Sequence, residues 1–408
     1  MSVFRSVPWT ARIVWEEATV AFLTVEAASL SGSAASWSES AKAWMFRSLF
    51  TNLCGITFDD WWRVLRANRF AIAPGALHRA ALVTAGSVLN SWYRRSEEKT
   101  FGARLDGIRV PPPLFVLGHW RSGTTLLHNL LALDDRFAFP NLYEVFFPHT
   151  FLATEDQRTG LVAPLIPRTR AFDNVAQGLD MPNEDEFATA AASLCSPYLW
   201  WAFPRNAATY ERYLTFRDAP SVEVERWKSA LLRFLQKMTL RYERPLLLKS
   251  PPHTARVGLL RTMFPDAKFV HVHRDPCTVF RSTRHLNDVL TKSLGFQSPL
   301  PSDRDDAVIR RYRAMHDAYF DDRADVPEGH LHELAFHDLE RDPIGAIRGV
   351  YQALDLPGFA DVRPRIQHHL DGLSDYRKNV YPSLDPDLNR RLRSEWGRSF
   401  EEWGYSIG

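Results

Sequence analysis

The first hundred residues carry apolar and polar positions in a pattern that is typical of helices. This stretch is rich in tryptophan and in basic residues. Trp61, Trp62 and Phe70 either pack a helical layer or line an apolar pocket. We therefore predict a helical N-terminal region over residues 1–105.

From about residue 106 onward, short apolar runs alternate with helical patterns. Three prolines precede Leu114–Leu117, an apolar run typical of a strand buried on both faces. A loop with two glycines follows, and then leucines at helical spacing. The same order of elements returns downstream, as a strand over 246–248, a helix over 254–264, a strand over 268–273 and a helix that opens at Asp275-Pro276. This alternation predicts one α/β domain over residues 106–408, with a central parallel sheet covered on both faces and a mainly helical C-terminal part.

Composition and charge exclude several classes of protein. The 408 residues are 45% hydrophobic and 24% charged, which is ordinary for a globular protein with a sizeable core. Fifty Lys and Arg against 48 Asp and Glu leave a net charge of +2, so no bulk attraction to nucleic acid is expected and any anion site must be local. Because the three cysteines are far apart, a disulfide framework or a cysteine zinc site is not expected.

No segment has the pattern of a signal peptide or of a membrane span. Glu16, Glu17 and Glu26 interrupt the first apolar stretch, and the span from Ala76 to Tyr93 is only mildly apolar. A crossing helix needs about 20 apolar residues. We therefore expect a cytoplasmic protein, and a helix lying on the membrane surface remains compatible with the sequence.

The segment GHWRSGTT, from Gly118 to Thr125, nearly matches the phosphate-binding Walker A pattern. Gly118 and Gly123 have the required separation, but Thr124 stands where the pattern has a lysine. That lysine reaches the β and γ phosphates of a nucleoside triphosphate. Backbone N–H groups of such a loop still form an anion site, and Arg121 can hold the anion from the side. The loop predicts a nucleotide with one anionic group beyond the α position; a glycine turn without a ligand is the alternative.

The segment FVLGHWRSGTTLLHNLL resembles the 5′-phosphosulfate loop of sulfotransferases that use 3′-phosphoadenosine 5′-phosphosulfate (PAPS). Its RSGTTLL form is similar to the bacterial and tyrosylprotein branches of that family. The resemblance implies a P-loop-like three-layer fold. It also implies that the donor is bound by Arg121, Ser122, Gly123, Thr124 and Thr125.

Further downstream, LLLKSPPHTARVGLLRTMFPDAKFVHVHRDPCTVFRSTRHL resembles the 3′-phosphate segment of the same family. Arg274 ends its second strand, and Ser282 follows eight residues later. An arginine at the carboxyl end of a strand faces the ligand crevice of an open sheet, and its planar fork suits a phosphate. A surface ion pair and an exposed helix serine are the alternatives. Arg377 and Lys378 resemble a degenerate form of the segment that closes over the 3′-phosphate; a solvated basic turn is the alternative.

The resemblance implies transfer of a sulfuryl group from PAPS to an acceptor hydroxyl or amine, which leaves adenosine 3′,5′-bisphosphate. Arg121 and Lys249 would supply positive charge where the leaving phosphate forms, so no metal is expected. The cytosolic branch has its histidine base where this chain has Pro251. The tyrosylprotein branch has a glutamate at nearly the offset of Glu144, so we predict Glu144 as the general base, with His253 as the alternative.

Other polar groups allow two interpretations. Asp275 matches either a metal ligand or, because a proline follows it, a helix N-cap, which we favour. The acidic run over residues 184–186 is predicted to cap a helix together with Asn183; a carboxylate that faces the acceptor is the alternative. His271 and His273 share a strand face, and we predict core or crevice histidines rather than metal ligands.

Two other functions compete with sulfotransfer: a P-loop kinase-like phosphotransferase and a non-catalytic nucleotide-binding module. Arg274 and Ser282 argue against the kinase, because ATP has no 3′-phosphate. Lys249 together with a candidate base argues against the module. The predicted partner is a small-molecule or lipid-like acceptor, as the aromatic segment SPYLWWAFP suggests, although core packing would also explain that segment. The acceptor's identity and the oligomeric state stay open.

Overall fold

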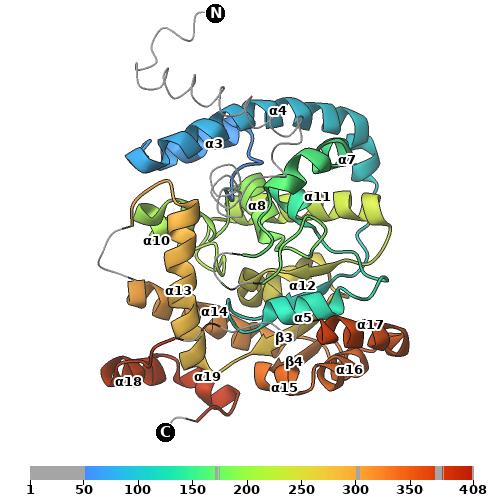
Figure 1. Cartoon of the computed structure of the whole chain (residues 1–408), viewed down its shortest axis with the longest axis vertical. Helices are drawn as coiled ribbons and strands as arrows, with labels where there is room; N and C mark the ends of the chain where they lie inside the picture. The colour runs from blue at the N-terminus through green and yellow to red at the C-terminus, as the bar shows by residue number, and fades with distance from the viewer. Residues whose placement is uncertain are drawn as a thin grey trace, which may run out of the picture.

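A four-stranded parallel sheet lies at the centre of the structure (Figure 1), a computed structural model that describes residues 51–170, 173, 175–299, 304–372, 379 and 381–406. The strand order is β2-β1-β3-β4, and each neighbouring pair is parallel. The strands are β1 Leu114–Leu117, β2 Leu247–Lys249, β3 Lys268–His273 and β4 Leu331–Ala335. Because the strands are parallel, all their carboxyl ends lie at one edge of the sheet, where the loops that follow β1, β2 and β3 come together.

Helices cover the sheet and make up most of the described chain. Before β2 they are α3 Phe58–Ala67, η3 Pro74–Ala76, α4 Leu77–Asp106, α5 Thr124–Leu131, α6 Leu142–Phe146, α7 Phe151–Val162, η4 Ala163–Leu165, α8 Glu186–Ser193, α9 Leu199–Ala202, η5 Pro204–Asn206, α10 Ala207–Glu211 and α11 Ser221–Tyr242. After β2 they are η6 Pro251–Arg256, α12 Val257–Met263, α13 Pro276–Leu294, α14 Arg304–Arg323, α15 Phe336–Arg341, α16 Pro343–Ala353, α17 Phe359–Asp371, α18 Pro386–Glu395 and α19 Gly397–Glu402.

The two faces of the sheet belong to two different hydrophobic clusters. Leu114 and Val116 of β1 pack with α5, α16 and α17. Phe115 and Leu117, which point to the opposite face because strand residues alternate, pack with α8, α11, α12 and α14. The strand is therefore fully buried on both sides, which explains its uninterrupted apolar sequence. The predicted three-layer α/β arrangement with a central parallel sheet is confirmed.

Most predicted elements occur close to their predicted bounds, with three differences. The second strand begins at Leu247 instead of Leu246. The Leu246 carbonyl oxygen accepts from the Leu114 N–H at 2.9 Å, and Leu246 forms an isolated bridge with Ala138. The helix predicted over 254–264 begins as the 3₁₀ helix η6 and becomes α-helical only at Val257. The strand β4 was not predicted.

The helices α3 and α4 lie against each other at one end of the molecule, at the top of Figure 1. The indole of Trp61 is buried and donates to Thr84 Oγ1 at 2.8 Å, so it belongs to the core that also holds Phe115. Trp62 and Phe70 are exposed instead. The interpretation as core residues therefore describes Trp61 but not Trp62 and Phe70, for which the pocket wall stays a prediction.

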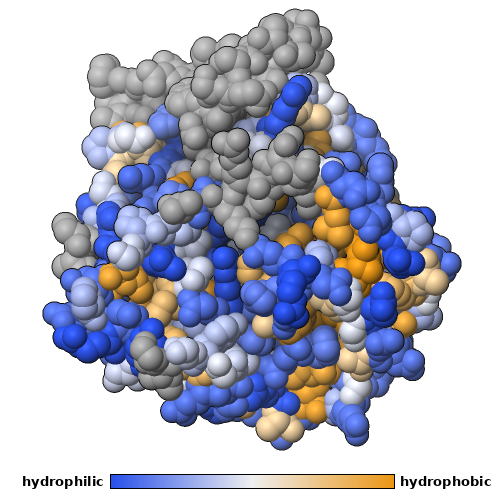
Figure 2. Space-filling model, turned by 60° about the horizontal axis from the view of Figure 1, so that its bottom comes forward, coloured by the Kyte–Doolittle hydropathy of each residue, from blue (hydrophilic) through white to orange (hydrophobic). Residues whose placement is uncertain are grey.

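The opposite end of the molecule is formed by helices α15 to α19. Figure 2, in which this end comes forward, shows hydrophilic residues around separate hydrophobic patches. None of the described helices is both long and apolar enough to cross a membrane.

Candidate functional site

The loop between β1 and α5 has a backbone conformation that only glycine adopts easily. Gly118 has φ 140° and Gly123 has φ 108°, both in the left-handed region. A Cβ atom on Gly118 would lie 2.5 Å from the carbonyl oxygen of Val272, and one on Gly123 would lie 2.2 Å from Cδ2 of Phe336. Arg121, between them, also has a positive φ of 72°. Such strain in a non-glycine residue is typical of functional sites.

This loop leaves the start of α5 open for an anion. Gly123 is the N-cap of α5 and supplies no capping side chain, so the N–H groups of the first turn have no side-chain cap. These groups, together with the positive end of the helix dipole, favour negative charge. Thr124 is buried and Thr125 is half-buried in the first turn, and the Ser122 hydroxyl donates to the carbonyl oxygen of His119 at 2.8 Å. The Ser122 N–H donates to the same carbonyl oxygen at 3.1 Å.

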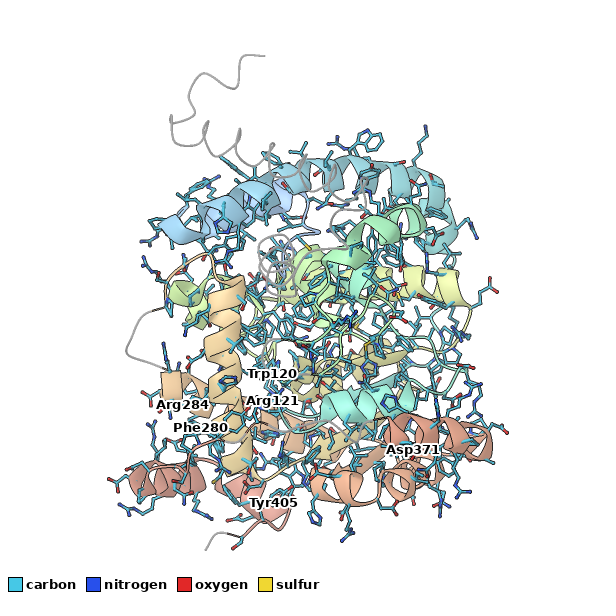
Figure 3. All side chains as sticks on the ribbon, viewed as in Figure 1. Trp120, Arg121, Phe280, Arg284, Asp371 and Tyr405 are labelled. Carbon is cyan, nitrogen blue, oxygen red and sulfur yellow. The ribbon has the colours of Figure 1, made fainter. Side chains whose placement is uncertain are left out.

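The two anion anchors predicted from separate parts of the sequence meet at Arg121. The Arg121 Nε donates to Ser282 Oγ at 2.8 Å, across 161 residues of chain. The Arg274 guanidinium donates to the backbone carbonyl oxygen of Arg121 at 3.3 Å and lies over the ring of Phe336, 4.4 Å from its centroid. Figure 3 shows Arg121 between α13, which carries Ser282, and α5. The glycine loop and the 3′-phosphate segment therefore form one continuous site.

A third segment reaches the same point from the C-terminal part of the chain. The Tyr381 hydroxyl lies 3.2 Å from Ser282 Oγ, and Asn379 Nδ2 donates to Tyr381 at 3.3 Å. Arg377 and Lys378, the predicted residues of this segment, lie outside the described residues.

A second cation, Lys249, ends β2 and is buried against Glu184. The distance from Lys249 Nζ to Glu184 Oε1 is 2.5 Å, and the Tyr198 hydroxyl donates to the other oxygen of Glu184. Burial lowers the pKa of Lys249 and Glu184 opposes this effect, whereas the charge of Arg170 lowers the pKa further. Arg170 also shares the carboxylate of Asp173 with Arg121, and both guanidinium–Oδ2 distances are 2.7 Å.

The site is thus a cluster of four cations with two internal carboxylates. The cations are Arg121, Arg170, Lys249 and Arg274, and the carboxylates are Asp173 and Glu184. An excess of positive charge at the carboxyl edge of a parallel sheet, next to an open helix N-terminus, is suited to a polyanionic ligand. Among the described residues, no group of three or more His, Cys, Asp or Glu could hold a metal ion.

Each residue of the acidic run 184–186 pairs with one basic residue, either at the end of β2 or in η6. Asp185 Oδ2 lies 2.6 Å from His253 Nε2, and Glu186 Oε2 lies 2.7 Å from the Arg256 guanidinium, with both side chains of each pair fully buried. The predicted helix cap by Asn183 and Glu186 is wrong, because α8 begins at Glu186 and has no side-chain cap. Glu184 pairs with Lys249 instead, and the alternative, a carboxylate that faces the acceptor, stays a prediction.

The two predicted bases lie in other networks. Glu144 forms the capping box of α6: its Oε2 accepts from the Asn141 N–H at 2.7 Å, and its Oε1 accepts from the Tyr242 hydroxyl at 2.8 Å. Burial, followed by the charge of Glu155, raises the pKa of Glu144 to about 8. His253 is fully buried, and its Nδ1 has no hydrogen-bond partner among the described residues.

Two other predictions are confirmed, that of Asp275 as a helix N-cap and that of His271 and His273 as core or crevice residues. Asp275 is the N-cap of α13, and its side chain accepts from the Thr278 N–H at 2.7 Å. His271 and His273 stack on the ring of Trp403, as core histidines would.

Sequence reasoning missed Arg170, Asp173, Tyr198 and Tyr381 and did not recognise Glu184 as part of the site. The only signal in the sequence was the density of acidic residues around Glu184.

Comparisons with known proteins give the family of the chain. Residues 112–361 match a family described as "Sulfotransferase family". Two relatives, named omega-hydroxy-beta-dihydromenaquinone-9 sulfotransferase Stf3, come from Mycobacterium bovis and Mycobacterium tuberculosis strain CDC 1551/Oshkosh. Each is 38% identical over 352 residues, which cover 86% of this chain and 90% of the relative.

Two solved structures have the same fold. Sulfotransferase STF9 from Mycobacterium avium has a TM-score of 0.65 at 20% identity, over 85% of this chain and 96% of its own. Sulfotransferase STF1 from Mycobacterium tuberculosis H37Rv has a TM-score of 0.62 at 18% identity, over 84% of this chain and 92% of its own.

Proposed function

This chain belongs to the sulfotransferase family, and we propose that it transfers a sulfuryl group from PAPS to the hydroxyl of a lipid-like alcohol. The observation that carries the choice of donor is the meeting of Arg121, Ser282 and Arg274 at one point of the sheet edge. A nucleotide with anionic groups at both its 5′ and its 3′ positions needs two such anchors close together. The open N-terminus of α5 and the two obligate glycines beside it fit the 5′ group.

PAPS supplies an activated sulfuryl group whose departure leaves negative charge on the oxygen that bridges sulfur and phosphorus. Arg121 and Lys249 are the cations assigned to that oxygen, and Ser122, Gly123, Thr124 and Thr125 bind the 5′ group through the loop and the first turn of α5. Arg274 and Ser282 bind the 3′-phosphate, and Arg377 and Lys378 are further candidates for it. Positioned cations give the charge stabilisation that such a transfer requires.

We assign the general base to Glu184 in preference to Glu144 or His253. Glu184 is the carboxylate in contact with Lys249, whereas Glu144 contacts Asn141, Tyr242 and Arg241, which are outside the cation cluster. When Lys249 donates to the bridging oxygen, Glu184 can accept the proton of the acceptor hydroxyl. The acceptor oxygen then forms a bond to sulfur, the bond from sulfur to the bridging oxygen breaks, and adenosine 3′,5′-bisphosphate leaves.

A lipid-like alcohol is supported by the surroundings of Glu184 and by the relatives. The ring of Tyr198, whose hydroxyl reaches Glu184, packs against Phe187 at 5.0 Å and against Trp120 at 6.1 Å between centroids. The relatives' name gives them a hydroxylated menaquinone as acceptor. Trp200 and Trp201 are buried, and each of them packs against Trp120.

Transfer of radiolabelled sulfate from PAPS to an omega-hydroxylated menaquinone, followed by chromatography, tests the proposal. We expect turnover that Arg121→Ala and Lys249→Ala each reduce by at least a hundredfold, the usual effect of removing a transition-state charge donor. Arg390→Ala, which changes an exposed arginine of α18, is the control. Transfer of the γ-phosphate from ATP in place of sulfate would favour a kinase. Binding of adenosine 3′,5′-bisphosphate without turnover of PAPS with a panel of alcohols and amines would favour a nucleotide-binding module.

A further inference from the structure

Large exposed hydrophobic side chains are concentrated on one part of the surface. The described residues contain nine of them, and seven lie between residues 58 and 92: Phe58, Trp62, Phe70, Leu77, Val88, Leu89 and Trp92. Trp62 is 52% exposed and Trp92 is 61% exposed. Scattered single hydrophobic residues are normal on a protein surface, but a group of this size that includes two tryptophans marks a binding surface.

These side chains belong to adjacent helices. The start of α3 touches the middle of α4, where the Phe58 N–H donates to Ser91 Oγ at 2.9 Å. Phe58 stacks on Trp62, and Trp62 meets Phe70 edge to face at 5.1 Å between centroids. Val88 and Trp92, four residues apart, share one side of α4. We call the exposed residues of α3, α4 and the segment between them the α3–α4 face; Figure 1 shows these helices at the end of the molecule away from α15 to α19.

Basic side chains accompany the hydrophobic ones. Arg63, Arg66 and Arg69 are exposed along α3 and just after it. Arg94 and Arg95 follow Trp92 by two and three residues on α4 and line a pocket of about 260 Å³.

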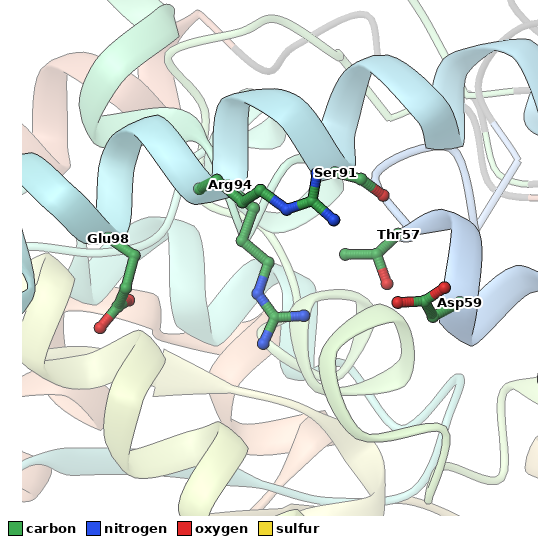
Figure 4. A pocket seen from close by; sticks show the side chains of 6 residues that line it. Thr57, Asp59, Ser91, Arg94 and Glu98 are labelled. Carbon is green, nitrogen blue, oxygen red and sulfur yellow. The ribbon is translucent and has the colours of Figure 1, made fainter.

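The two arginines of this pocket are the groups that would bind a phosphate. Thr57 and Ser91 lie beside Arg94 (Figure 4), but their hydroxyl groups already donate to Asp60 Oδ2 at 2.7 Å and to the Ser87 carbonyl oxygen at 2.8 Å. Asp59 and Glu98 also line the pocket, and Glu98 forms an ion pair with Arg233 at 2.6 Å. Two adjacent arginines can hold the phosphate of a lipid headgroup by charge-assisted hydrogen bonds.

We propose that the α3–α4 face binds the surface of a bilayer that contains anionic phospholipids. The aromatic side chains enter the boundary between headgroups and acyl chains, and Arg94 and Arg95 hold a lipid phosphate. Tryptophan and phenylalanine beside arginine are the composition of interfacial helices. A symmetric dimer through this face would place its arginines against their own copies, which argues against a second copy of the chain as the partner.

Co-sedimentation of the full chain with vesicles tests this surface without any assay of sulfotransfer. The vesicles contain either phosphatidylcholine alone or phosphatidylcholine with about one third phosphatidylglycerol, because the second composition supplies negative surface charge. We expect binding to the mixed vesicles to exceed binding to phosphatidylcholine at least tenfold and to fall as salt is added.

Paired variants separate the two parts of the face. Trp62→Ser combined with Trp92→Ser should lower binding to the mixed vesicles at least tenfold, whereas Val222→Ser, at a residue that is 64% exposed on α11, should not change it. Arg94→Gln combined with Arg95→Gln should lower binding to the mixed vesicles by roughly tenfold or more, because each basic residue near a charged surface contributes comparably. The control is Arg390→Gln combined with Arg391→Gln, an adjacent exposed pair on α18.

Three results would overturn the proposal. The full chain could stay in the supernatant with both kinds of vesicle, or the control pairs could lose as much binding as the face variants. The tryptophan variant could also convert a dimer into a monomer in the absence of lipid, which would make the face a contact between copies. Thermal unfolding of each variant checks its folding, and surface changes of this kind usually alter stability little.

Discussion

Replacing Glu184 by glutamine removes one negative charge from the site and keeps the shape of the side chain. Because Glu184 is the proposed base, kcat should fall by about 10² to 10⁴, the range that general-base catalysis contributes. A second effect concerns Lys249, whose pKa is already lowered by burial and is held up by Glu184. Without the carboxylate, the pKa of Lys249 should fall further.

The second effect has a definite sign. The proposed role of Lys249 requires its protonated form, so the rate must decline as the pH rises through the pKa of this group. In Glu184→Gln, that decline should begin at a lower pH than in the unaltered protein. A variant that lacked only the base would have a lower rate, but its rate would decline at the same alkaline pH as in the unaltered protein.

The stability change follows from the burial of the pair. Removing one partner of a fully buried ion pair costs about 3–5 kcal/mol. Here the Lys249 side chain is 3% exposed and that of Glu184 is 17% exposed, and glutamine retains an acceptor oxygen for Nζ. We therefore expect a smaller loss of unfolding free energy, about 1–3 kcal/mol, which leaves the protein folded for kinetic measurements.

The assay is kcat and kcat/KM for PAPS across a pH series, with Glu144→Gln as the matched carboxylate variant. Glu144→Gln should keep a near-normal kcat. The reasoning is refuted if Glu184→Gln retains the original kcat and pH profile, and a large loss of kcat in Glu144→Gln alone would return the base to Glu144.

Three further changes test the donor site and the buried carboxyl group. In Gly123→Ala the new Cβ would lie 2.2 Å from Phe336, at a backbone φ of 108°, which costs about 1–3 kcal/mol of strain. The affinity for adenosine 3′,5′-bisphosphate should therefore fall at least tenfold. An unchanged affinity in calorimetric titration would contradict this expectation. Arg274→Ala should weaken the binding of the same ligand by about 1.5–3 kcal/mol, whereas adenosine 5′-phosphosulfate, which has no 3′-phosphate, should bind as before. Equal losses of affinity for both ligands would show that Arg274 does not bind the 3′-phosphate. The pKa of Glu144 is raised from 4.5 to about 8, so the folded state binds this proton more tightly than the unfolded state does. The resulting stability, on the order of a few kcal/mol, is lost as the pH rises from 4.5 to about 8. Denaturant unfolding at both ends of this interval should show a decrease of the unfolding free energy with pH in the unaltered protein and no such decrease in Glu144→Gln.

The sequence allowed prediction of the parts of the fold that depend on local patterns. The β1 strand is buried on both faces and is continuously apolar, and the glycine loop has fixed spacing, so both were found. The β4 strand, Leu331–Ala335, has two adjacent polar residues, His332 and Glu333, and only one buried residue, so it carried no such signal. Arg170 and Asp173 lie in a segment without a motif, and only the fold brings them to Arg121.

The acidic run shows why neighbours in a sequence can have different roles. Its ion pairs join residues that are 65 to 70 positions apart, so no local sequence pattern could predict them. Two of the pairs, made by Asp185 and Glu186, are completely buried and fix the segment against η6. The pair made by Glu184 lies at the end of this series and retains some solvent exposure. Breaking either buried pair leaves an uncompensated charge in the core, whereas the outer pair can separate when a ligand replaces one partner. The same three-residue run thus supplies both the buried anchor and the more exposed carboxylate that we propose as the base.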